Sequence, residues 1–237
     1  MNELIMELAQ NGQSKFVYDV FFALGFVSVF LFVLYMGCRM KVKPLKSVLV
    51  VLIVYPIMVL WMFILCWADS GFQSFGGNNI VRVFVYVPVL AYPVAKLLKI
   101  DFKVICSMLS VGPLAVHAVS HFGCMFAGCC EGYPSSWGLW NPRFDEIRFP
   151  NQPLEALTAW AIIFFLLIRA GRKKYVPDGR EYPLMLVLFG STRFLFEFLR
   201  NNEKLLLGCS GLAFHALFMA VVGAVVLYRM KEKTAVR

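Results

Sequence analysis

The chain alternates long apolar stretches with short polar connections. Seven apolar stretches are present, each near the ~20 residues that an α-helix needs to cross a bilayer. They cover residues 17–37, 47–67, 80–98, 104–126, 154–168, 184–200 and 209–228. Lipid offers no hydrogen-bond partner to open backbone groups, so we expect each stretch to be helical. The pattern predicts an all-α membrane protein, with seven transmembrane helices in a single transmembrane domain over residues 1–237.

The overall composition supports this prediction. Hydrophobic residues make up 60% of the chain and charged residues 16%, whereas a soluble domain has about 25% charged residues. The net charge is +9, but the basic residues flank apolar stretches and form no separate basic domain. We therefore expect the membrane, and not nucleic acid, to be a partner of this protein.

Basic residues gather after the first, third, fifth and seventh apolar stretches. These residues are Arg39, Lys41, Lys43, Lys46, Lys96, Lys99, Lys103, Arg169, Arg172, Lys173, Lys174, Arg180, Arg229, Lys231, Lys233 and Arg237. Because positively charged loops stay on the cytoplasmic side, the N-terminus is predicted outside and the C-terminus in the cytoplasm. The outer side then holds the connection 68–79, an irregular segment near 127–153 and the connection 199–206. Polar and turn residues converge there, so we expect the chemistry on this side.

The sixth apolar stretch carries ionisable residues. It contains STRFLFEFLR, in which Arg193, Glu197 and Arg200 lie at i, i+4 and i+7 and share one helix face. An ionisable residue in a membrane span has a high free-energy cost unless it is paired or in contact with water. Three such residues on one face therefore predict an internal polar cavity. A guanidinium fork matches phosphate oxygens, which favours an anionic headgroup. The alternatives are an ion pair that locks two helices together and Arg200 reaching the headgroups from a helix end.

The stretch FGCMFAGCCEGYP, residues 122–134, combines three glycines with three cysteines. Gly123, Gly128 and Gly132 allow the backbone to bend, to approach another helix or to expose amides to a ligand. His121 directly precedes it and is a candidate base or phosphate contact, or a satisfied buried histidine. His117, one turn earlier, is interpreted as a helix-packing hydrogen bonder.

The cysteines of this stretch are Cys124, Cys129 and Cys130. Zinc sites usually take pairs of closely spaced ligands from two segments of the chain. Only one such segment is present here, so no metal is expected. A disulfide between the adjacent Cys129 and Cys130 would be strained. The leading interpretation is that these small residues pack at a helix break.

Three further residues carry weaker signals. Glu155 opens the fifth stretch, as a helix-terminal carboxylate or a site residue. Tyr18 lies at the outer end of the first stretch, where interfacial aromatics are ordinary. Arg82 is an interfacial anchor or an additional positive group.

Three segments in order resemble the prolipoprotein diacylglyceryl transferase family. They are HFGCMFAGCCEGYPSSWG, FPNQPLEAL and DGREYPLMLVLFGSTRFLFEFLR. The likeness covers most of residues 70–200, and Tyr18 fits the tyrosine of the family's first span. The family has seven spans with its N-terminus outside, which agrees with the distribution of basic residues.

The resemblance implies an activity. Such an enzyme transfers the diacylglyceryl group of phosphatidylglycerol to the lipobox cysteine thiol of a prolipoprotein signal peptide, which forms a thioether and releases glycerol 1-phosphate. It works at the outer leaflet of the bacterial cytoplasmic membrane and needs no metal or soluble cofactor.

The resemblance also implies the site. Arg193, Glu197 and His121 are the expected catalytic residues: Glu197 orients Arg193 as in the family, and His121, which stands where the family has an arginine, is the candidate base. The expected substrate-binding residues are Tyr18, Gly76, Gly77, Gly123, Cys124, Gly128, Gly132, Gln152, Glu155 and Arg200.

The chain departs from the family pattern at several positions. Phe75 and Phe149 stand where the family has histidines, and Phe189 where it has a tyrosine. His121 replaces an arginine and Cys124 an asparagine. The alternative is therefore a non-catalytic or altered-specificity paralogue that binds anionic phospholipid or signal peptides.

Overall fold

The computed structural model describes residues 1–69, 80–172, 175–201 and 210–235. Two strands, β1 (Pro134–Asn141) and β2 (Glu146–Arg148), join a set of helices. The helices are α1 (Asn2–Gln10), α2 (Ser14–Arg39), α3 (Pro44–Asp69), the 3-10 turn η1 (Ile80–Val83), α4 (Val87–Leu98), α5 (Phe102–Leu109), α6 (Gly112–Ala127), α7 (Asn151–Gly171), α8 (Glu181–Glu197) and α9 (Gly211–Ala235).

Within the described ranges, five helical segments are long and apolar enough to cross a membrane. They are α2, α3, the consecutive pair α5 and α6, α7 and α9. The α4 helix is a shorter apolar helix, and α8 has 17 residues that include Arg193 and Glu197. The prediction of a mostly helical, multi-pass membrane protein is confirmed.

Two of the predicted apolar helices are broken. The stretch 80–98 forms η1, a turn and then α4. The stretch 104–126 forms α5 and α6, which are separated at Ser110 and Val111. Pro88 and Pro113 lie in the first turns of α4 and α6, where a missing backbone N–H is tolerated. The apolar pattern located these segments, but the prolines divide them.

The segment predicted to be irregular, 127–153, contains an antiparallel two-stranded sheet. The sequence predicted an irregular segment here and did not predict this short hairpin. Asn2 of α1 holds the sheet: its Nδ2 donates to the Gly138 carbonyl (3.3 Å), and its Oδ1 accepts from Trp140 N (3.1 Å). The hairpin thereby covers one end of the helices.

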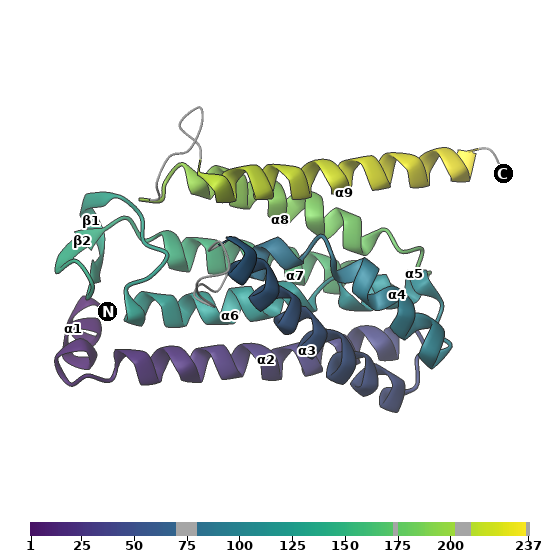
Figure 1. Ribbon diagram of the computed structural model, residues 1–237, viewed down its shortest axis with the longest axis horizontal. Helices are drawn as coiled ribbons and strands as arrows, with labels where there is room; N and C mark the ends of the chain where they lie inside the picture. Colours follow the sequence, from purple (N-terminus) through teal and green to yellow (C-terminus); the bar gives the residue numbers. More distant parts are fainter. Residues whose placement is uncertain (70–79, 173–174, 202–209, 236–237) are drawn as a thin grey trace.

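The centre of the molecule is α6, which packs against α2 on one side and α7 on the other (Figure 1). The helices α8 and α9 form a second tightly packed pair. Most of α6 is buried, and glycines bring its neighbour close: a Cβ on Gly25 would lie 3.3 Å from the Val116 backbone.

The connections that carry the basic residues lie together at one end of the molecule. Arg39 donates to the carbonyls of Ala170 and Gly171, at 3.2 and 3.0 Å. Lys46 Nζ donates to the Leu98 carbonyl at 2.7 Å. The last turns of α9 lie at this same end, while α1 and the hairpin lie at the opposite end (Figure 1).

Replacement of Gly190 tests the packing of α8 on α9. An alanine Cβ there would lie 2.7 Å from Ala220 N and 2.8 Å from the Ala216 carbonyl oxygen, so the two backbones must move apart. We expect Gly190→Ala to lower the free energy of unfolding by roughly 1–3 kcal/mol, measured by thermal unfolding in detergent. Gly211→Ala is the control, because the added Cβ would meet no atom of the described residues within 4 Å. Equal melting of both variants would contradict the close approach.

Candidate active site

Glu155 of α7 is the hub of a buried charge cluster. Its Oε1 accepts from Arg200 Nε at 2.9 Å and Asn151 Nδ2 at 2.7 Å, and lies 3.4 Å from Arg193 Nη1. Glu155 is 2% exposed. The residue before α7 is Pro150, so Glu155 lies inside the first turns and does not cap the helix.

Glu197 of α8 is the second carboxylate of the cluster. It forms the predicted i, i+4 ion pair with Arg193, accepts a hydrogen bond from Ser210 Oγ, and lies 3.6 Å from Arg200 Nε. The two guanidiniums and two carboxylates are nearly sealed from solvent. Buried ions are tolerated only when they are paired, and here two positive charges meet two negative ones.

Two histidines of α6 adjoin Glu155. His117 Nε2 lies 3.6 Å and His121 Nδ1 3.7 Å from Glu155 Oε2, both too long for a hydrogen bond. Their ring centroids are 3.9 Å apart. His117 was interpreted as a packing residue, and the structure places it in the cluster. Its spacing of four residues from His121 is the sequence signal that could have found it.

A cavity of about 290 Å³ lies beside these histidines, between α2, α3, α6 and the turn that follows α6. Apolar side chains of α2 and α3 form much of its wall. Its remaining wall is formed by Tyr18, Val116, His117, Ser120, His121, Cys124, Cys129 and Cys130. Tyr18, His121 and Cys124 are thus brought together as predicted site residues. Arg193 and Arg200 are not lining residues: they lie behind the histidines, next to Glu155.

The predicted glycines have packing roles. Gly128 adopts φ +68° and ends α6. Gly132 forms a backbone bridge with Arg200, and a Cβ on Gly132 would lie 2.7 Å from the Phe149 carbonyl oxygen. A Cβ on Gly123 would lie 2.9 Å from Phe21 of α2. These glycines therefore allow neighbouring segments of the chain to pack closely against one another.

The predicted pair Gly76 and Gly77 lies outside the described residues, as does Phe75.

The turn after α6 positions the cysteines. Cys129 N donates to the Cys124 carbonyl at 3.2 Å, and Gln152 Nε2 donates to the Cys129 carbonyl at 2.8 Å. Gln152, predicted to bind substrate, therefore holds this turn. The six cysteines within the described ranges are free thiols. Hydrogen bonds from Cys124 and Cys129 lower the pKa of the Cys130 thiol well below its ordinary value.

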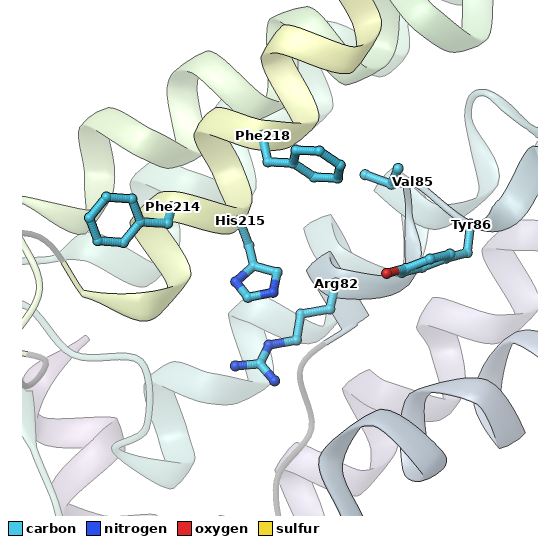
Figure 2. Close-up of a pocket in the computed structure, with 6 residues that line it drawn as sticks. All are labelled: Arg82, Val85, Tyr86, Phe214, His215 and Phe218. Atoms are coloured by element: carbon cyan, nitrogen blue, oxygen red, sulfur yellow. The ribbon is translucent and has the colours of Figure 1, made fainter. Parts of the chain in front are cut away.

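Arg82 belongs to a different cavity, of about 260 Å³, between η1 and α9. Figure 2 shows its side chain beside His215, with Phe214, Phe218 and Tyr86 around them. Arg82 therefore does not line the cavity next to His121.

The helices and the buried ions define a multi-pass membrane protein with a polar site enclosed among apolar helices. The profile of the prolipoprotein diacylglyceryl transferase family matches residues 12–229. The chain belongs to this family, as the sequence motifs predicted.

Curated relatives are similar over part of their length. The phosphatidylglycerol–prolipoprotein diacylglyceryl transferase 2 of Clostridium perfringens (strain 13 / Type A) is 24% identical over 173 residues, which are 68% of this chain and 65% of that protein. The corresponding protein of Clostridium tetani is 26% identical over 57% of this chain and 54% of its own. That of Dehalococcoides mccartyi (strain CBDB1) is 28% identical over 52% and 50%. The chain thus spans half to two thirds of these relatives.

Neutralisation of Glu155 tests the hub. Glu155→Gln keeps the shape but removes a charge that faces two guanidiniums, and an uncompensated buried charge costs roughly 3–5 kcal/mol. We expect a markedly lower melting temperature in detergent. The matched control is Glu7→Gln, at an exposed position of α1, which should melt like the wild type. A cluster that contributes nothing to folding would give two indistinguishable melting curves.

Proposed function

We propose that the protein transfers the diacylglyceryl group of phosphatidylglycerol to the lipobox cysteine of a prolipoprotein, at the outer side of the bacterial cytoplasmic membrane. Family membership supports this reaction. The observation that carries it is the buried pairing of Arg193 and Arg200 with Glu155 and Glu197, directly behind two histidines on the wall of a partly apolar cavity.

The cavity suits a phospholipid donor. Apolar side chains of α2 and α3 would face acyl chains, while Tyr18, His117 and His121 would face the headgroup. Arg193 Nε is buried and makes no hydrogen bond within the described part of the chain. A phosphate that reached the histidines would therefore find a guanidinium donor behind them, in surroundings where such contacts are strong.

The reaction forms one bond and breaks one. The acceptor thiolate attacks the glyceryl carbon that bears the phosphate, so that the S–C bond forms as the C–O bond breaks. The phosphate oxygen leaves with the bonding electron pair as glycerol 1-phosphate. His121 would take the thiol proton, which can pass to the released phosphate. Arg193 and Arg200 would stabilise the charge on the departing oxygen.

The proposed orientation has seven spans, with the N-terminus outside and the C-terminus in the cytoplasm. The basic connections gather at the end opposite α1 and the hairpin, as the positive-inside bias requires. Tyr18 and His121 lie in the halves of α2 and α6 nearest the hairpin. The signal peptide and the donor would therefore enter from the outer leaflet.

The role of Arg193 can be tested with purified protein, radiolabelled phosphatidylglycerol and a lipobox peptide. Arg193→Lys keeps the charge but loses the planar fork, and we expect transfer to fall roughly 100-fold or more. Arg229→Lys, on the exposed end of α9, should transfer like the wild type. Undiminished transfer by Arg193→Lys would remove Arg193 from the mechanism. Wild-type protein that binds the lipid without transferring it would support the non-catalytic alternative.

The role of His121 can be tested through pH. His121→Asn removes the base, and we expect transfer to fall roughly 100-fold or more at neutral pH. Its remaining rate should rise about tenfold per pH unit below the thiol pKa of ~8.5, because the thiolate must then come from solution. The wild type should show a shallower rise. Parallel pH profiles would show that His121 is not the base.

A further inference from the structure

The turn after α6 brings three metal-ligating side chains together. The ligand atoms of His121, Cys124 and Cys130 all lie within 4.8 Å of one another. α6 supplies His121 and Cys124, and Gly128 then ends the helix in the left-handed conformation. The chain folds back so that Cys130 meets the face it has just left. This reversal supplies a ligand from a second segment of the chain, which the linear spacing of the cysteines did not predict.

Two features of this cluster are unexplained by folding alone. His121 is 6% exposed, and its Nδ1, which lies 3.7 Å from Glu155 Oε2, is buried with no hydrogen-bond partner in the described ranges. A buried polar atom without a partner destabilises the fold. Cys130 adopts a backbone φ of +58°, which residues other than glycine rarely adopt. Strain and an unsatisfied polar atom at one place are typical of a binding site.

We propose that His121, Cys124 and Cys130 form a binding site for a thiophilic divalent metal ion, for which Zn²⁺ is the test ion. One imidazole and two thiolates are ligands that zinc prefers. Zinc holds such ligands roughly 3.5 Å apart, so binding would draw these atoms together by at most about 1 Å. Side-chain rotation can supply a movement of that size.

A second cluster shares His121 but fits a cation less well. The ligand atoms of His117, His121 and Glu155 also lie within 4.8 Å of one another. However, Arg200 and Arg193 already pair with Glu155. A divalent cation there would face two guanidiniums. The cysteine cluster is therefore the assigned site.

The site goes beyond the proposed transfer and does not depend on it. Its three ligands all line the cavity, so a bound ion would have an open fourth position there, as catalytic zinc sites do. A ring nitrogen that coordinates a metal cannot accept a proton. If His121 binds the metal through the nitrogen that would act as base, zinc-loaded protein should transfer more slowly than chelator-treated protein.

Metal binding can be measured directly. The protein is purified in detergent under reducing conditions with a tag free of histidine, equilibrated with Zn²⁺ and desalted, and its metal is counted by mass spectrometry. We expect about one ion per chain, and in Co²⁺-loaded protein a thiolate-to-cobalt charge-transfer band. Cys124→Ser and Cys130→Ser should each weaken binding at least tenfold. Cys38→Ser, at an exposed cysteine of α2, should bind like the wild type.

The controls keep the test decisive. Size-exclusion profiles and melting curves of the metal-free variants show whether each one folds. His117→Asn should retain the metal. Loss of metal binding in this variant would move the site to the second cluster and overturn the assignment. The proposal would be overturned if the wild-type protein retained no Zn²⁺ after desalting. It would also be overturned if a Cys124→Ser and Cys130→Ser double variant bound Zn²⁺ as tightly as the wild type. None of these readouts requires transfer activity, so failure of the transfer assay leaves them interpretable.

Discussion

An ionised carboxylate inside a membrane protein must have cationic partners at hydrogen-bond distance, and Glu155 imposes this requirement on three helices. Its cationic partners are Arg193 from within α8 and Arg200 from just beyond the end of α8, and the two histidines of α6 adjoin it at 3.6 and 3.7 Å. α6, α7 and α8 must converge to satisfy it. The cluster thus fixes the helix arrangement and the position of the cavity together.

The convergence needs backbones that can approach closely. Gly132 lets the segment after α6 meet both the Phe149 carbonyl and the backbone of Arg200. Arg148 of β2 reinforces this crossing, because its Nη1 donates to the Gly132 carbonyl at 3.3 Å and lies 3.7 Å from Glu131. The hairpin therefore supports the site through Arg200, although it supplies no lining residue of the cavity.

Periodicity and local spacing predicted the parts of this structure that depend on neighbours in sequence. The i, i+4 pairing of Arg193 with Glu197 follows from helix geometry and is present. The long-range contacts carried no such signal: nothing local pairs Glu155 with Arg200, which is 45 residues away. The two broken helices and the β-hairpin were missed because apolar runs mark burial but do not show where a proline or a turn interrupts a helix.

The charge balance of the cluster explains how the chain accommodates a histidine at residue 121, where the family pattern has an arginine. Two arginines and two glutamates already balance, so a neutral imidazole at this position keeps the buried site neutral. An arginine, as the family pattern has it, would leave one positive charge in excess and would hold a phosphate monoanion more strongly. Phe189 acts in the same direction, because its ring packs against His117 with centroids 4.8 Å apart and offers no hydroxyl. Under the proposed function, this chain would therefore have a weaker resting attraction for an anionic headgroup. The guanidiniums would have to be released from their carboxylates as the phosphate arrives, so the free-energy cost of that release would weaken substrate binding.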